Sequence, residues 1–103
     1  MTLRAAPKPE KPIRDRRYMA DVRSLGCIIC GTNVEVEVHH VITGRYSQRK
    51  ASDLETICLC GWHHRQRHAS PSGFRAMYGD ELEMAAKTKL AVEKMRAELI
   101  GGR

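Results

Sequence analysis

The chain has 103 residues and a formal charge of +6, with a sequence pI near 9.5, and its aromatic side chains are one Phe, one Trp and three Tyr. This length allows one small domain, and so few aromatic residues predict a thin core that needs metal ions or disulfides to stabilise it. No apolar run approaches the roughly 20 residues of a membrane span and the first residues lack a signal-peptide core, so we expect no membrane partner and a cytoplasmic, reducing compartment.

The first predicted elements are a basic arm and a short helix. Residues 1–14 contain Pro and Lys without hydrophobic periodicity, which predicts a flexible arm. Asp15 can cap a helix through Leu25, and Gly26 is the expected stop. The positive charge favours phosphate-bearing partners, although an ordinary solvated surface is the alternative. The candidate nucleic-acid contacts in this part of the chain are Arg14, Arg16 and Arg17.

A cysteine pair and a strand follow the helix. Cys27-x-x-Cys30 can present two sulfur atoms to one ion, and the alternative, a redox dithiol, would require a βαβ context that the sequence lacks. Residues 34–42 alternate apolar and polar side chains as a half-buried strand does. His39 and His40 would point to opposite faces of this strand, so that one can bind a metal while the other faces the attacking water.

A polar loop and a second strand are expected next. Residues 43–54 form a basic loop, in which a surface that binds the nucleic-acid backbone is expected. Residues 55–59 are predicted to return as a strand, in which Cys58 fills a small position. The candidate nucleic-acid contacts in the loop are Arg45, Arg49 and Lys50.

The pattern of cysteines and histidines predicts two metal sites. The chain has four Cys and five His, which are too many for one tetrahedral ion. Cys60-x-x-His63 can complete a Cys₃His zinc site with the first cysteine pair. His64 and His68 lie four residues apart on one face of a helix that starts at Gly61, so two imidazoles can bind a second ion.

Two further helices are predicted after the metal ligands. Ser70-Pro71 begins a short helix that ends at Gly79, and Asp80 caps a long helix over about residues 80–100. An apolar stripe on the long helix is expected to face the core or a partner. Its members are Leu82, Ala86, Leu90, Met95 and Leu99.

These motifs, in this order, resemble the HNH endonuclease superfamily with its ββα-metal motif. The likeness covers about residues 18–79, and residues 51–69 with Phe74 and Tyr78-Gly79 are similar to phage recombination-enhancement nucleases of the Ref-like type. The resemblance implies an α+β fold: a small zinc-stabilised ββα-metal domain over residues 15–103, with a metal-binding core over 27–68 and flanking N- and C-terminal helices.

The resemblance also implies a role for each site residue. It implies a structural Zn²⁺ on Cys27, Cys30, Cys60 and His63. It implies a catalytic divalent metal, Mg²⁺, Mn²⁺ or Zn²⁺, on His39, His64 and His68. His40 would then be the general base. The family's middle asparagine would stand near Glu55, where this chain has no Asn, and Asp53 is the nearest residue that could orient His40. Candidate phosphate clamps are Arg65 and Arg67.

The predicted function is metal-dependent hydrolysis of DNA phosphodiester bonds by a phage or prophage enzyme of recombination or DNA processing, in the bacterial cytoplasm. DNA is the expected partner and a recombinase filament a candidate second one, while the sequence does not decide between monomer and dimer. The alternatives are a catalytically silent zinc module that binds DNA or a recombination protein, and a structural zinc protein that binds partners through its C-terminal helix. His40 favours catalysis, because a binding module needs no imidazole beside a metal.

Overall fold

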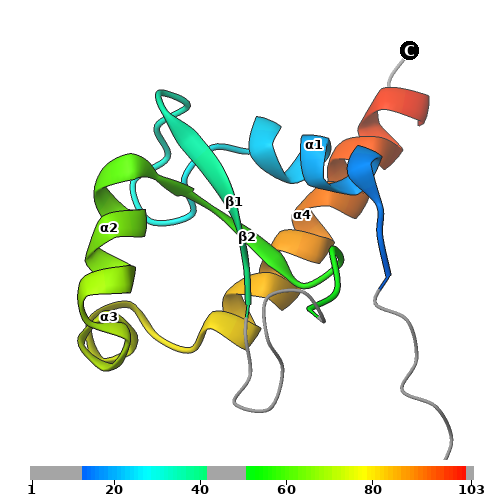
Figure 1. Cartoon of the computed structure of the whole chain (residues 1–103). Coiled ribbons are helices and arrows are strands. Elements are labelled where there is room, and N and C mark those ends of the chain that lie inside the picture. Colours follow the sequence, from blue (N-terminus) through cyan, green and yellow to red (C-terminus); the bar gives the residue numbers. More distant parts are fainter. Residues whose placement is uncertain (1–12, 42–50, 102–103) are drawn as a thin grey trace, which may run out of the picture.

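The computed structural model describes residues 13–41 and 51–101, with side chains through Leu99. Within them, the chain forms a small α+β fold of four helices and one two-stranded antiparallel hairpin (Figure 1). The elements are α1 (Arg16–Ser24), β1 (Val36–His40), β2 (Thr56–Cys60), α2 (Gly61–Ala69), α3 (Pro71–Tyr78) and α4 (Glu81–Gly101). None of the helices in the described part is both long and apolar enough to span a membrane.

Local capping explains where α1 begins and ends. The Asp15 carboxylate accepts a hydrogen bond from the backbone N–H of Tyr18 at 2.9 Å, so it satisfies one of the free donors of the first turn. Gly26 follows the helix with a φ of +85°, and a Cβ there would lie 2.7 Å from Asn33 Oδ1. Only glycine fits this position without strain. The predicted helix and its stop are therefore confirmed.

The hairpin pairs β1 and β2 in a single register. Val36 lies opposite Cys60, and His40 lies opposite Thr56. All five residues of β2 are buried, whereas in β1 only Val36 and His39 are buried. The first strand begins two residues later than the predicted 34–42, because Glu35 has a φ of +52° that interrupts the extended backbone.

The caps of the later helices also agree with the sequence. Ser70 Oγ accepts from the Gly73 N–H at 3.1 Å and Pro71 occupies the first turn of α3, which ends at Gly79 with a φ of +105°. Asp80 Oδ1 accepts from the Leu82 N–H at 2.8 Å and so caps α4. These boundaries are fixed by short-range chemistry that the sequence displays directly.

Most of the core lies between the hairpin, α1 and α4, while α2 packs against the other side of the hairpin and α3, which carries the buried Phe74, packs beside α2 (Figure 1). The side chains with the least exposure are large and mostly aliphatic, as expected for a small core. They are Val22, Thr56, Ile57, Leu59, Phe74 and Val92.

The apolar stripe predicted on α4 was expected to face the core or a partner, and its three leucines do not face the core. Leu82, Leu90 and Leu99 are 41%, 67% and 77% exposed. The face that contacts the rest of the molecule instead carries Met84, Ala85, Thr88 and Val92, all buried. Thr88 tolerates burial because its hydroxyl donates to the Met84 carbonyl oxygen at 2.9 Å. Apolar residues occupy both sides of this helix, and contacts with α1 and β2 select the side that is buried.

Candidate metal centres and an adjacent polar site

The first candidate metal centre gathers ligands from three separate segments. Cys27 and Cys30 lie in the turn after α1, Cys60 ends β2, and His63 lies in the first turn of α2. One ligand atom from each lies within 4.8 Å of every other. The turn is closed by the Gly31 N–H, which donates to the Cys27 carbonyl oxygen at 2.7 Å. The predicted Cys₃His cluster is confirmed as a spatial arrangement.

The spacing of these four atoms fits a tetrahedral zinc ion. Zn–S and Zn–N bonds of about 2.3 and 2.0 Å place neighbouring ligands roughly 3.3–3.8 Å apart. Here Cys27 Sγ is 3.7 Å and Cys60 Sγ is 3.2 Å from His63 Nδ1, and the Cys30 and Cys60 sulfur atoms are 3.9 Å apart. Three thiolates with one imidazole are the donor set of a structural zinc site.

The pKa values of Cys27 and Cys58 differ in a way that suits Cys27, but not Cys58, to bind a metal ion. Burial acts to raise the pKa of Cys27, but hydrogen bonds from the backbone of Cys30, Cys60 and Ile29 outweigh it and lower the pKa to about 6. Burial raises the pKa of Cys58 to about 11. A thiol that ionises readily binds metal, whereas a buried neutral thiol is inert. Cys58 lies outside the cluster, as predicted.

The second candidate centre consists of three histidines. His39 on β1 and the pair His64 and His68 on α2 offer nitrogen atoms within 4.8 Å of one another. The Nε2 atoms of His64 and His68 are 3.1 Å apart, close to the spacing of two ligands on one small ion. Burial, followed by the neighbouring His64 and His39, lowers the pKa of His68, which favours the neutral imidazole that binds metal.

Two carboxylates that the sequence did not single out contact these histidines. Glu37 Oε1 is 2.6 Å from His64 Nδ1, and Glu81 Oε1 is 3.2 Å from His39 Nε2. Glu37 could have been found, because it lies two residues before His39 on the same face of β1. Glu81 comes from α4, and nothing in its local sequence indicates the contact. Carboxylates in this position orient metal-binding imidazoles.

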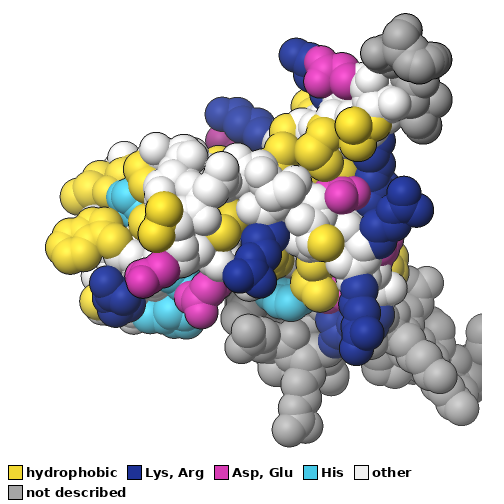
Figure 2. All heavy atoms as spheres, turned by 90° about the horizontal axis from the view of Figure 1, so that it is seen from above, with side chains coloured by type: hydrophobic (Ala, Val, Ile, Leu, Met, Phe, Trp, Pro, Cys, Tyr) yellow, Lys and Arg dark blue, Asp and Glu magenta, His cyan; other side chains and the backbone are white. Residues whose placement is uncertain are grey.

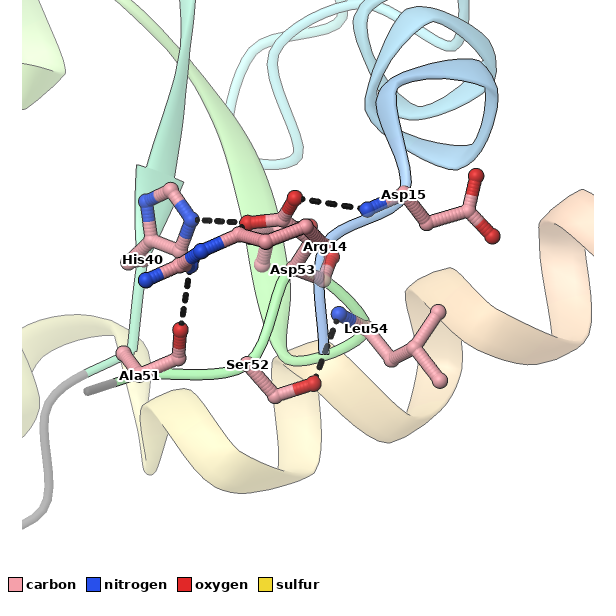
Figure 3. A network of polar contacts seen from close by, with 8 residues as sticks. Arg14, Asp15, His40, Ala51, Ser52, Asp53 and Leu54 are labelled. Atoms are coloured by element: carbon pink, nitrogen blue, oxygen red, sulfur yellow. Dashed lines mark hydrogen bonds and ion pairs between the residues drawn. The ribbon is translucent and has the colours of Figure 1, made fainter. Parts of the chain in front are cut away.

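On the opposite face of β1, His40 belongs to a separate polar network (Figure 3). Its Nε2 donates to Asp53 Oδ1 at 2.7 Å, and the Asp15 N–H donates to Asp53 Oδ2 at 2.8 Å. Arg14 Nη1 donates both to Asp53 Oδ1 at 3.1 Å and to the Ala51 carbonyl oxygen at 2.9 Å. Asp53 is only 3% exposed. The structure therefore brings together His40 and Asp53, the pair expected from the sequence.

This network keeps Asp53 ionised. Burial acts to raise its pKa, but hydrogen bonds from His40, the Asp15 backbone and Arg14 outweigh that effect, and the net pKa is lowered. An ionised carboxylate only accepts hydrogen bonds, so the neutral form of His40 has its proton on Nε2 and its free electron pair on Nδ1. Figure 3 shows this second ring nitrogen pointing away from Asp53.

The candidate phosphate contacts have different surroundings. Arg67 Nε donates to Glu81 Oε2 at 2.9 Å, whereas Arg65, Arg16 and Arg17 are exposed. In Figure 2, Lys and Arg side chains are spread over the visible face, and histidines adjoin acidic side chains at the end occupied by α2 in Figure 1. The roles of these arginines stay predictions. The remaining candidates, Arg45, Arg49 and Lys50, and most of the arm over residues 1–14 lie outside the described residues.

Comparison with known proteins gives a family and a partial relative. Residues 2–93 match the model of the family described as "Protein of unknown function (DUF968)". The uncharacterized protein YdfU of Escherichia coli (strain K12) is 30% identical over 80 residues, which cover 76% of this chain and 22% of YdfU. The chain thus spans well under half the length of that relative. No solved structure matches the chain.

Proposed function

The chain belongs to the DUF968 family of proteins of unknown function, and we propose that it is a metal-dependent endonuclease of the HNH type that hydrolyses DNA phosphodiester bonds. One observation carries the proposal: the two adjacent histidines on β1 contact different sets of residues. His39 meets His64 and His68, while His40 is held by Asp53. The order of two antiparallel strands followed directly by a metal-binding helix also supports a ββα-metal fold.

The two histidines of β1 divide the chemistry between them. A divalent ion bound by His39, His64 and His68 would supply positive charge to stabilise the scissile phosphate and the leaving oxygen. His40 would accept a proton from the attacking water at Nδ1, because Asp53 occupies the other ring nitrogen. Asp53 holds the ring orientation, and its buried, ionised state keeps the required tautomer.

The cysteine cluster has a structural role in this proposal. Its three cysteines and His63 join the turn after α1 to the end of β2 and the start of α2. His64, the next residue, belongs to the histidine cluster. A zinc ion at the first site would therefore fix the start of the helix that carries two ligands of the second site.

The test is cleavage of supercoiled and single-stranded DNA by protein stripped of metal and refilled with Zn²⁺ plus Mg²⁺ or Mn²⁺. We expect the wild type to nick DNA and His40→Ala to cleave about 10²- to 10⁴-fold more slowly, the usual contribution of a general base. Metal analysis of both proteins is the control, because His40→Ala should keep both ions. Wild-type rates in His40→Ala would rule out His40 as the base.

A catalytically silent DNA-binding zinc module is the second candidate function. The net charge of +6 favours it as much as it favours a nuclease, because phosphate contacts alone give non-specific binding. The same experiment separates the two functions. Salt-dependent DNA binding without cleavage, by fully metal-loaded protein, would select the binding module, either alone or beside a recombination protein.

A further inference from the structure

We propose that Glu81, the first residue of α4, is a positioning residue for the histidine cluster, and that Arg67 holds Glu81 in place. The catalytic consequence rests on the proposed nuclease function, whereas the effect on metal binding does not. The inference extends the site beyond the β1–β2–α2 unit, because α4 then contributes a side chain on which the metal ligands depend.

Both oxygens of the Glu81 carboxylate contact other side chains. Oε1 lies 3.2 Å from His39 Nε2, and Oε2 accepts from Arg67 Nε at 2.9 Å. The three side chains are 12%, 3% and 16% exposed, so solvent screens these contacts only weakly. A carboxylate bonded through both oxygens has one orientation, and that orientation is passed on to the imidazole of His39.

The backbone that carries Glu81 is also fixed. Asp80 caps the helix through the Leu82 N–H, and Met84 and Ala85, one turn further, are buried in the core. Glu81 therefore starts from a rigid helix end and not from a loop. A supporting side chain on a rigid element can hold a metal ligand within the narrow tolerance that coordination requires.

The same contacts change the role expected for Arg67. Arg67 was a candidate phosphate clamp in the sequence, but its Nε donates a hydrogen bond to Glu81. It compensates the charge of a carboxylate that is largely withdrawn from water. Arg67 would then act on the metal through Glu81 and His39, in a chain of contacts that runs from α2 through α4 to β1.

The first experiment measures Co²⁺ affinity of the histidine cluster by calorimetry and cobalt absorption, in protein whose cysteine cluster already contains Zn²⁺. Glu81→Gln keeps the shape of the side chain and removes its charge. We expect it to weaken Co²⁺ binding at this cluster by about 10- to 100-fold, the usual cost of losing such a partner, while the Zn²⁺ is retained. Glu83→Gln, in the same first turn but exposed, is the matched control and should bind Co²⁺ like the wild type.

The second experiment places Arg67 in the chain of contacts. Arg67→Ala should weaken Co²⁺ binding, and its combination with Glu81→Gln should weaken binding by less than the product of the two single effects, because both act through one contact. If Arg67→Ala instead raises the KM for DNA with unchanged Co²⁺ affinity, Arg67 clamps phosphate and its place in the chain is overturned.

The outcomes for Glu81 and for the nuclease proposal are independent. Weaker Co²⁺ binding in Glu81→Gln, in a protein that never cuts DNA, supports the positioning role and rejects the nuclease. Unchanged Co²⁺ affinity in Glu81→Gln, with or without a lower melting temperature, rejects the positioning role even if DNA is cut. Absence of Co²⁺ binding to the wild-type histidine cluster rejects it as well.

Discussion

At the scale of single residues, Asp53 determines which nitrogen of His40 carries a proton. It is buried, ionised and bonded to three groups, of which His40 Nε2 is the nearest at 2.7 Å. The pKa of Asp53 lies below the ordinary value near 4, so the carboxylate is already charged at pH values above that ordinary value and is protonated only in stronger acid. The orientation of His40 by Asp53 should therefore persist throughout the neutral and mildly acidic range.

Asp53→Asn should lower the rate of DNA cleavage by about 10²- to 10⁴-fold while both ions stay bound. An amide can donate to Nε2, which allows the tautomer with the proton on Nδ1, where the base must accept. Steady-state cleavage with metal analysis would measure this. Asp15→Asn is the matched control, because asparagine is an equally good helix cap and the Asp15 backbone N–H remains. Equal rates in the two variants would remove Asp53 from the mechanism.

Cys58 should be unreactive in the folded protein. Its pKa of about 11 leaves roughly one thiol in a thousand ionised at pH 8, and only the thiolate reacts with alkylating agents. Peptide mapping after alkylation of the zinc-loaded protein at pH 8 should find Cys58 unmodified until denaturant is added. Cys58→Ser should keep zinc, whereas Cys60→Ser should lose it. Rapid alkylation of Cys58 in the folded state would show that this thiol is not held neutral by burial.

The sequence predicted the candidate metal ligands but not the carboxylates beside them. Four Cys and five His are rare side chains, so their spacing alone indicated both clusters. The chain has twelve acidic residues, and acidic side chains in folded proteins are mostly exposed to solvent. Glu81 could not be distinguished from its neighbour Glu83, because its contact with His39 depends on where α4 lies in three dimensions.

At the scale of elements, helix ends were predictable and the buried face of α4 was not. Asp15, Ser70 and Asp80 cap their helices through contacts within three residues, which the sequence contains in full. The face of α4 that is buried depends on contacts with α1 and β2, which the sequence does not show. Apolar side chains occur on both sides of this helix, so periodicity alone could not tell the face that packs in the core from the face left for a partner.

A pair of truncations tests the buried face of α4. Met84→Ala should lower the free energy of unfolding by about 2–5 kcal/mol, since it removes a buried side chain and leaves a cavity. Leu90→Ala, at a position 67% exposed, should change it by less than about 0.5 kcal/mol. Urea unfolding of zinc-loaded proteins measures both. The reverse order would place Leu90, and not Met84, in the core.

At the scale of the whole molecule, the two candidate metal centres should differ in how removal of a bound ion affects the fold. The cysteine cluster joins three segments of the chain, and a structural zinc can contribute more than 10 kcal/mol to folding at neutral pH. The histidine cluster includes the exposed His68. An ion bound there should exchange more readily and matter less for stability.

Stepwise chelation should therefore remove function before structure. A mild chelator should abolish cleavage while circular dichroism stays native, and a stronger chelator should lower the melting temperature by tens of degrees or unfold the chain. Metal analysis at each step assigns the losses. His68→Ala should reproduce the first state and Cys60→Ala the second. Simultaneous loss of both ions would show that the two centres bind metal as one unit.

The segment before α1 has a consequence for the boundaries of the functional unit. The Asp53 N–H donates to the Ile13 carbonyl oxygen at 2.9 Å, and the next two residues bind the Asp53 carboxylate. An engineer who trimmed the chain at the first helix would discard these three residues and keep every metal ligand. The fragment would keep both candidate metal clusters, yet His40, the proposed base, would lose the support that these residues give to Asp53. Transplanting the His40–Asp53 pair to another scaffold would thus require a short stretch that resembles a dispensable linker.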